Sequence, residues 1–180
     1  NNLPLNISSL ELPVKAEDTQ LVKTAIGKYQ ILAQHEDPTE DGFKLGMILT
    51  ADRSNYFKSS NKPDFNAAVP DGNGGYYLYT NWEDRPGSMS RIHLGKLGPN
   101  GYESVKLEGL VDFKDVNGTW VNCFGTLSPW GTPLTSEELY FDSTKAWFKD
   151  KDEPKLMSEY LGLPTDGSGL WSNPYDYGYI

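Results

Sequence analysis

A lone cysteine and a pair of adjacent carboxylates stand close together in the second half of the chain. Cys123 ends an apolar stretch, and Glu137 and Glu138 follow it after a loop rich in Gly and Pro. A thiolate favours a softer ion such as iron or zinc, whereas carboxylates suit calcium. If both segments are strands of one sheet, the thiol and the carboxylates can lie at the same end. Adjacent residues of a strand point to opposite faces, so we expect one of the two Glu side chains to reach a given ion.

A second set of polar residues lies upstream, at the end of an aromatic segment. Asn81 and Glu83 flank Trp82 within residues 79–85. Each of these residues also has an ordinary structural interpretation. A cysteine in a strand is commonly a small buried apolar residue, exposed Glu pairs are commonly solvated, and Asn81 can simply end a strand. Composition alone predicts a structural role for each of these residues.

Short strands separated by turns must position these residues. Residues 71–75, with three Gly and one Asn, predict a tight turn before an aromatic strand. Alternation and β-forming residues predict strands at 29–33, 45–49, 76–81, 90–94, 105–107, 119–124 and 131–136. Residues 142–161 favour helical turns broken by Pro154, and 171–180 return to a strand-like composition. The pattern is typical of a sandwich or a propeller and does not distinguish the two.

Composition indicates an ordered chain built from many short elements. Of its 180 residues 37% are hydrophobic and 13% aromatic, and these large apolar groups argue against disorder. The 18 Gly and 12 Pro are spread along the chain and predict frequent turns. The opening stretch mixes Pro4 and Pro13 with charged residues, which predicts an N-terminal arm over residues 1–27. Its first residue is not Met, which is typical of a mature or trimmed terminus.

The charge balance excludes several classes of partner. Sixteen basic against 25 acidic residues give a net charge of -9, which repels nucleic acid and anionic membranes. Such a chain must bind a phosphate through a local Arg cluster or through bound metal. One Cys and two His cannot form an internal disulfide or a zinc finger. No stretch reaches the roughly 18 apolar residues that a membrane span requires.

Residues 122–138 resemble the signature of PhoX-type alkaline phosphatases. They read Asn-Cys-x-Gly-x-x-x-Pro-Trp-Gly-Thr-x-Leu-Thr-x-Glu-Glu. Residues 80–83 are similar to the Asn-His-Glu segment of that family, and 88–91 to its Ser-x-Ser-Arg pattern. Residues 173–179 resemble its Asn-Pro-Tyr-x-Tyr-Gly segment. The resemblance thus runs in order from about residue 55 to 180, and the Pro-Trp-Gly-Thr stretch is its most specific part.

The resemblance implies a secreted or periplasmic enzyme that hydrolyses phosphate monoesters at a central iron and calcium site. The implied fold is all-β, part of a β-propeller with short helical insertions, and residues 28–180 would form its first blades. Cys123 would bind iron, Glu138 or Glu137 would bind calcium, Glu83 would be a further calcium contact, and Asn81 would lie near the phosphate. The cations would activate an oxo or hydroxide nucleophile and neutralise the phosphate oxygens.

Two departures from the family keep other interpretations open. Trp82 stands where the family has His, and the family's remaining metal-binding carboxylates and phosphate-binding Arg lie further along its longer chains. We therefore expect a remaining polypeptide to complete the propeller. A non-catalytic propeller acting as a secreted binding or structural protein is the alternative, favoured by Trp82 and by the 11 Tyr and 5 Trp. A third interpretation, as another propeller hydrolase such as a calcium-dependent lactonase or phytase, rests only on analogy of fold. The catalytic interpretation requires the thiol to lie near Asn81 and the Glu pair.

Overall fold

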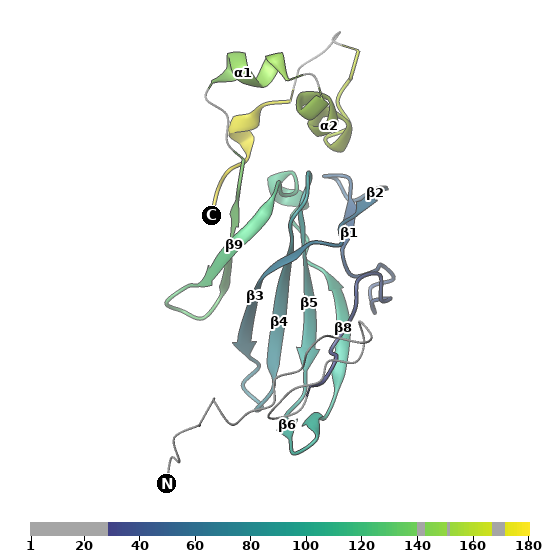
Figure 1. Ribbon diagram of the computed structural model, residues 1–180, viewed down its shortest axis with the longest axis vertical. Coiled ribbons are helices and arrows are strands. Elements are labelled where there is room, and N and C mark those ends of the chain that lie inside the picture. Colours follow the sequence, from purple (N-terminus) through teal and green to yellow (C-terminus); the bar gives the residue numbers. More distant parts are fainter. Residues whose placement is uncertain (1–28, 140–142, 151, 167–171) are drawn as a thin grey trace, which may run out of the picture. The chain divides into compact units, whose positions relative to one another are not determined.

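The computed structural model describes residues 29–139, 143–150, 152–166 and 172–180. The chain divides into two compact units, Asn1–Ala33 and Gln34–Ile180, and every described helix and strand lies in the second (Figure 1). The predicted arm over residues 1–27 and the first residue of the predicted tail strand, Trp171, lie outside the described residues. No described helix combines the length and the apolar character needed to cross a bilayer.

The described elements are short. The strands are β1 (Met47–Leu49), β2 (Tyr56–Ser59), β3 (Pro63–Pro70), β4 (Tyr76–Trp82), β5 (Ser88–Leu94), β6 (Leu97–Gly98), β7 (Gly101–Tyr102), β8 (Val105–Leu110), β9 (Asn122–Leu127) and β10 (Pro133–Glu137). The helices are the 3-10 turn η2 (Lys114–Val116), α1 (Thr144–Lys149), α2 (Asp152–Tyr160) and the 3-10 turn η3 (Pro174–Asp176). The prediction of an all-β fold with short helical insertions is confirmed.

The largest sheet is an antiparallel meander of four strands in the order β3-β4-β5-β8 (Figure 1). The predicted turn before β4 forms because Asp71 Oδ1 accepts the backbone N–H groups of Asn73 and Gly75 at 2.7 and 2.9 Å. The β6–β7 hairpin is inserted between β5 and β8. Four antiparallel strands are what one propeller blade contains. Closure of several blades into a propeller stays a prediction.

The two faces of this sheet meet different neighbours. Alternation along β4 places Asn81 and Trp82 on opposite faces. Trp82 is buried, with its ring beside Gly46 and at a tilted angle to the ring of His35. On the Asn81 face lies β9, which pairs antiparallel with β10 in a separate two-stranded sheet. The candidate residues of β4 and β9 therefore meet where two sheets contact each other.

A loop covers the edge of the large sheet at β8. The backbone amides of Glu40 and Asp41 donate to Leu107 O and Glu108 O, and Leu110 N donates to Asp41 Oδ2 at 2.9 Å. The strand is bulged here, with Gly109 at a φ of +149° directly beneath the Asp41 carboxylate. An open strand edge would offer unpaired backbone groups to other chains, so this loop protects it.

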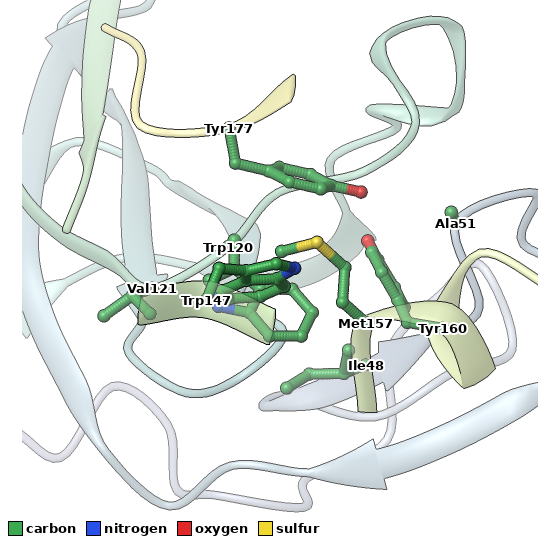
Figure 2. Packing of buried hydrophobic residues seen from close by; sticks show 8 residues of the cluster. All are labelled: Ile48, Ala51, Trp120, Val121, Trp147, Met157, Tyr160 and Tyr177. Atoms are coloured by element: carbon green, nitrogen blue, oxygen red, sulfur yellow. The ribbon is translucent and has the colours of Figure 1, made fainter. Parts of the chain in front are cut away.

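A hydrophobic core joins the helices to the strands that carry the motif. Its side chains converge in Figure 2 and come from Ile48, Ala51, Trp120, Val121, Trp147, Met157, Tyr160 and Tyr177. Both indoles are fully buried, and Trp147 Nε1 donates to Ser172 O at 3.2 Å. Ser143 caps α1 by accepting from Ala146 N. This cluster orders the segments on either side of the β9–β10 hairpin.

Several boundaries differ from the sequence predictions. Residues 29–33 form no strand, and the tail forms the turn η3 within the described residues. Pro154 does not break a helix: it lies in the first turn of α2, where its missing N–H would have had no partner in the helix. β2 and β3 have no counterpart among the predicted strands.

Candidate functional site

Asn81 connects the large sheet to β9. Its side chain is 1% exposed, and Nδ2 donates to Cys123 O at 3.1 Å and to Phe124 O at 3.2 Å. Two carbonyl oxygens can face only the NH₂ end of the amide, which settles the orientation of the group. Its Oδ1 has no hydrogen-bond partner among the described residues. The structure thus brings the Asn81 amide against the backbone of Cys123.

The Cys123 thiol lies in negatively charged surroundings. Its side chain is half-buried, and burial raises its pKa above the ordinary value of 9.0. A hydrogen bond from the Phe124 amide opposes that rise, while the charges of Glu138, Asp64 and Glu83 add to it. The structure therefore places Glu138 and Glu83 within electrostatic reach of the thiol.

Three carboxylates from separate segments act electrostatically on the Cys123 thiol. Asp64 lies near the start of β3, Glu83 follows β4, and Glu138 follows β10. With the other described residues, none of the three makes a hydrogen bond or ion pair through its carboxylate. No described residue pairs with these charges, so together they would attract a cation. No three His, Cys, Asp or Glu side chains of the described residues lie close enough together to hold a metal ion by themselves.

Glu137 has a different environment from Glu138. Its carboxylate accepts from Trp120 N at 2.6 Å, Gly178 N at 2.7 Å and Tyr179 N at 3.2 Å. Burial raises the pKa of Glu137, and these three hydrogen bonds oppose the rise. The Glu137 carboxylate, at the end of β10, thus binds both Trp120 and the last residues of the described chain. Of the adjacent pair, Glu138 is the one that acts on the thiol.

A backbone turn at Val121 places Glu138 beside the start of β9. Val121 has a φ of +53°, a left-handed conformation that β-branched residues rarely adopt. Its N–H donates to Asp84 O at 3.0 Å, and its carbonyl accepts from Glu138 N at 2.9 Å. This residue therefore holds together the ends of β4, β9 and β10. A Val in an apolar run predicts extended backbone, so the sequence carries no signal of this turn.

Asn122 is a further polar residue of the site. It is fully buried, and Nδ2 donates to Thr135 Oγ1 at 3.1 Å across the hairpin, while Oδ1 has no partner among the described residues. Gly87 lies so close that a Cβ there would come within 2.1 Å of Asn122 Oδ1. A glycine at this position is thus required for the β4–β5 turn to approach β9.

Sequence reasoning assigned no role to Asn122 and did not identify Asp64. Asn122 could have been found as the first residue of the resembled motif. Asp64 follows Pro63 in a stretch without a strand-like pattern, and nothing in the sequence relates it to Cys123.

Trp82 has a packing role. Its Nε1 donates to Ser90 Oγ at 2.9 Å, and the indole lies on the face of β4 opposite to Asn81. The side chain at this position is therefore directed away from Cys123 and the carboxylates around it.

Comparison with known proteins gives one family for this chain. A family model described as alkaline phosphatase PhoX matches residues 79–180, more than half of the chain. Asn81, Glu83, Cys123, Glu137 and Glu138 all lie within the matched region. No curated protein and no solved structure matches the chain.

Proposed function

This chain belongs to the PhoX alkaline phosphatase family, and from that premise we propose that it supplies part of a metal-dependent site for the hydrolysis of phosphate monoesters. The supporting observation is that Asn81 bonds to the Cys123 backbone where β9 contacts the large sheet, and that the charges of three carboxylates act on the Cys123 thiol. These residues lie in β3, β4 and β9 or directly after β4 and β10, and they are far apart in the sequence. In a secreted or periplasmic enzyme of this family, that arrangement would mark the reaction centre.

The donors of this chain fit part of an iron and calcium site. A thiolate at Cys123 suits iron, and the carboxylates of Glu138 and Glu83 suit calcium. Because the described residues offer no complete group of three ligands, this chain would share the site with further residues. We assign those residues to the polypeptide that completes the propeller. Bound metal ions would neutralise phosphate oxygens and lower the pKa of bound water.

The residues of the chain have defined tasks in this proposal. Cys123 must release its proton to bind a cation, and its pKa is raised in the metal-free chain, so metal affinity should increase with pH. Glu138 and Glu83 would supply carboxylate oxygens to a cation. Because all these groups are anionic or neutral, they repel a phosphate until cations are present. Substrate binding therefore depends on the metal, in a chain whose net charge is -9.

Metal analysis together with a chromogenic phosphomonoester tests this function. We expect iron and calcium in the protein purified together with the polypeptide that completes the site, and turnover that a chelator abolishes. C123S should lose iron, and E138Q should lose calcium. E137Q is the matched control, because that carboxylate is occupied by backbone amides. Unchanged iron in C123S, or turnover that survives complete metal removal, would contradict the proposal.

A non-catalytic binding role is the second candidate, and an exposed apolar surface favours it. Phe124, Leu127 and Trp130 lie on and beside the β9–β10 turn, and Trp130 is 76% exposed. The turn is well ordered, since Ser128 N donates to Thr132 O at 2.8 Å and their hydroxyls also bond. Calcium without iron and without turnover would support this function instead.

A further inference from the structure

Asn81 is a buried polar side chain that links β9 to the large sheet beside Cys123. Among the described strands, β9 forms ladder pairs with β10 only, so the two sheets are not joined by strand pairing at this point. The amide of Asn81 spans the gap and bonds to two successive carbonyls, of Cys123 and Phe124. The buried amide therefore joins the backbone of Cys123 and Phe124 directly to β4.

The chemistry of the amide argues against direct contact with a phosphoryl group. Phosphate oxygens accept hydrogen bonds, and the only donors of Asn81 are the two N–H bonds of its NH₂ group. Both are directed at backbone carbonyls, and the side chain is 1% exposed. The remaining group, Oδ1, can only accept.

We propose that Asn81 is a positioning residue that holds the Cys123–Phe124 backbone in place, and that it acts on the site through Cys123 rather than by binding phosphate. This deepens the proposed function and rests on it for the effect at the metal. The anchoring of β9, in contrast, is a property of this chain that can be measured without metal.

Thiol labelling measures the anchoring directly. Cys123 is the single cysteine, so a chromogenic disulfide reagent reports on it alone. N81L keeps a similar side-chain volume and removes both donors, and N81D keeps the shape but places oxygen against the two carbonyls. With two hydrogen bonds lost, we expect labelling of the metal-free protein to accelerate about tenfold in either variant. If N81L does not fold, the labelling rate of N81D provides the measurement.

T80V is the matched control for this measurement. Thr80 precedes Asn81 on β4 and faces the other side, where its hydroxyl donates to Asn66 Oδ1 at 2.6 Å. Loss of that bond should reduce stability but leave the labelling rate of Cys123 unchanged. The inference is overturned if the Asn81 variants label at the wild-type rate, or if T80V accelerates labelling as much as they do.

Cobalt binding separates the positioning role from a phosphate contact. Co²⁺ added to the wild-type protein should give a thiolate-to-metal absorption band, and N81L should weaken Co²⁺ binding about tenfold. A variant with normal Co²⁺ binding and a raised KM for the chromogenic ester would show a phosphate contact and overturn the inference. If the wild-type protein gives no such band, the proposed metal site fails, and the labelling rates still decide the role of Asn81.

Discussion

Glu137 and Glu138 are neighbours in the sequence and have separate tasks in the structure. One carboxylate is occupied by three backbone N–H groups, and the other is free of described partners and acts on the thiol of Cys123. Alternation along a strand predicts that such a pair separates onto two faces, but not which member faces the site. The backbone bond between Glu138 N and Val121 O decides that.

Replacement of Glu137 by Gln should destabilise the protein. Both carboxylate oxygens accept backbone N–H groups, and Gln places an NH₂ against one set of these donors. We expect a loss of about 1–2 kcal/mol in the free energy of unfolding, measured by urea denaturation. E138Q should change it by less than about 0.5 kcal/mol. Equal losses in the two variants would show that Glu137 has no special structural role.

At the scale of elements, the bulge in β8 depends on a close approach between a loop and a strand. Asp41 lies over Gly109, accepts from Leu110 N, and donates its own amide to Glu108 O. The loop therefore adds backbone hydrogen bonds along an edge strand that would otherwise be open. The approach is possible because residue 109 has no side chain.

Replacement of Gly109 by Ala should disrupt this edge. Its φ is +149°, and a Cβ would come within 2.0 Å of Asp41 Oδ2, so both the backbone and the loop must shift. We expect a loss of about 2–4 kcal/mol, seen as a lower thermal midpoint. G72A is the control, because Gly72 also has a positive φ but no atom within 4 Å of a Cβ. A G109A midpoint at or above that of G72A would contradict the interpretation.

For the molecule as a whole, the hydrophobic core connects the helices to the site. Trp120 and Val121, directly before β9, pack with Trp147 of α1 and with Met157 and Tyr160 of α2. Trp120 Nε1 also donates to Glu153 of α2. Because the same short segment enters the core and carries Asn122 and Cys123, damage to the core should be transmitted to the site.

W147A tests this coupling. Removal of a fully buried indole should destabilise the protein by about 3–5 kcal/mol, measured by urea denaturation. In the fraction that remains folded, labelling of Cys123 should also accelerate, because β9 loses the support of the core. F148A is the comparison, since Phe148 is its neighbour on α1 and is 50% exposed. A destabilised W147A with the wild-type labelling rate would show that the core and the site are independent.

Local signals in the sequence determined much of this protein. The turn at 71–75, the strands around 76–81 and 90–94, and the motif at 122–138 depend on residues close to one another in the chain. Only the tertiary structure decided that Asn81 bonds to the backbone of Cys123 and that Val121 turns left-handed. It also decided that the charges of Asp64 and Glu138, rather than that of Glu137, act on the thiol. These outcomes depend on the register and packing of segments far apart in the sequence, and such relations are set when the whole core assembles, because no local pattern encodes them.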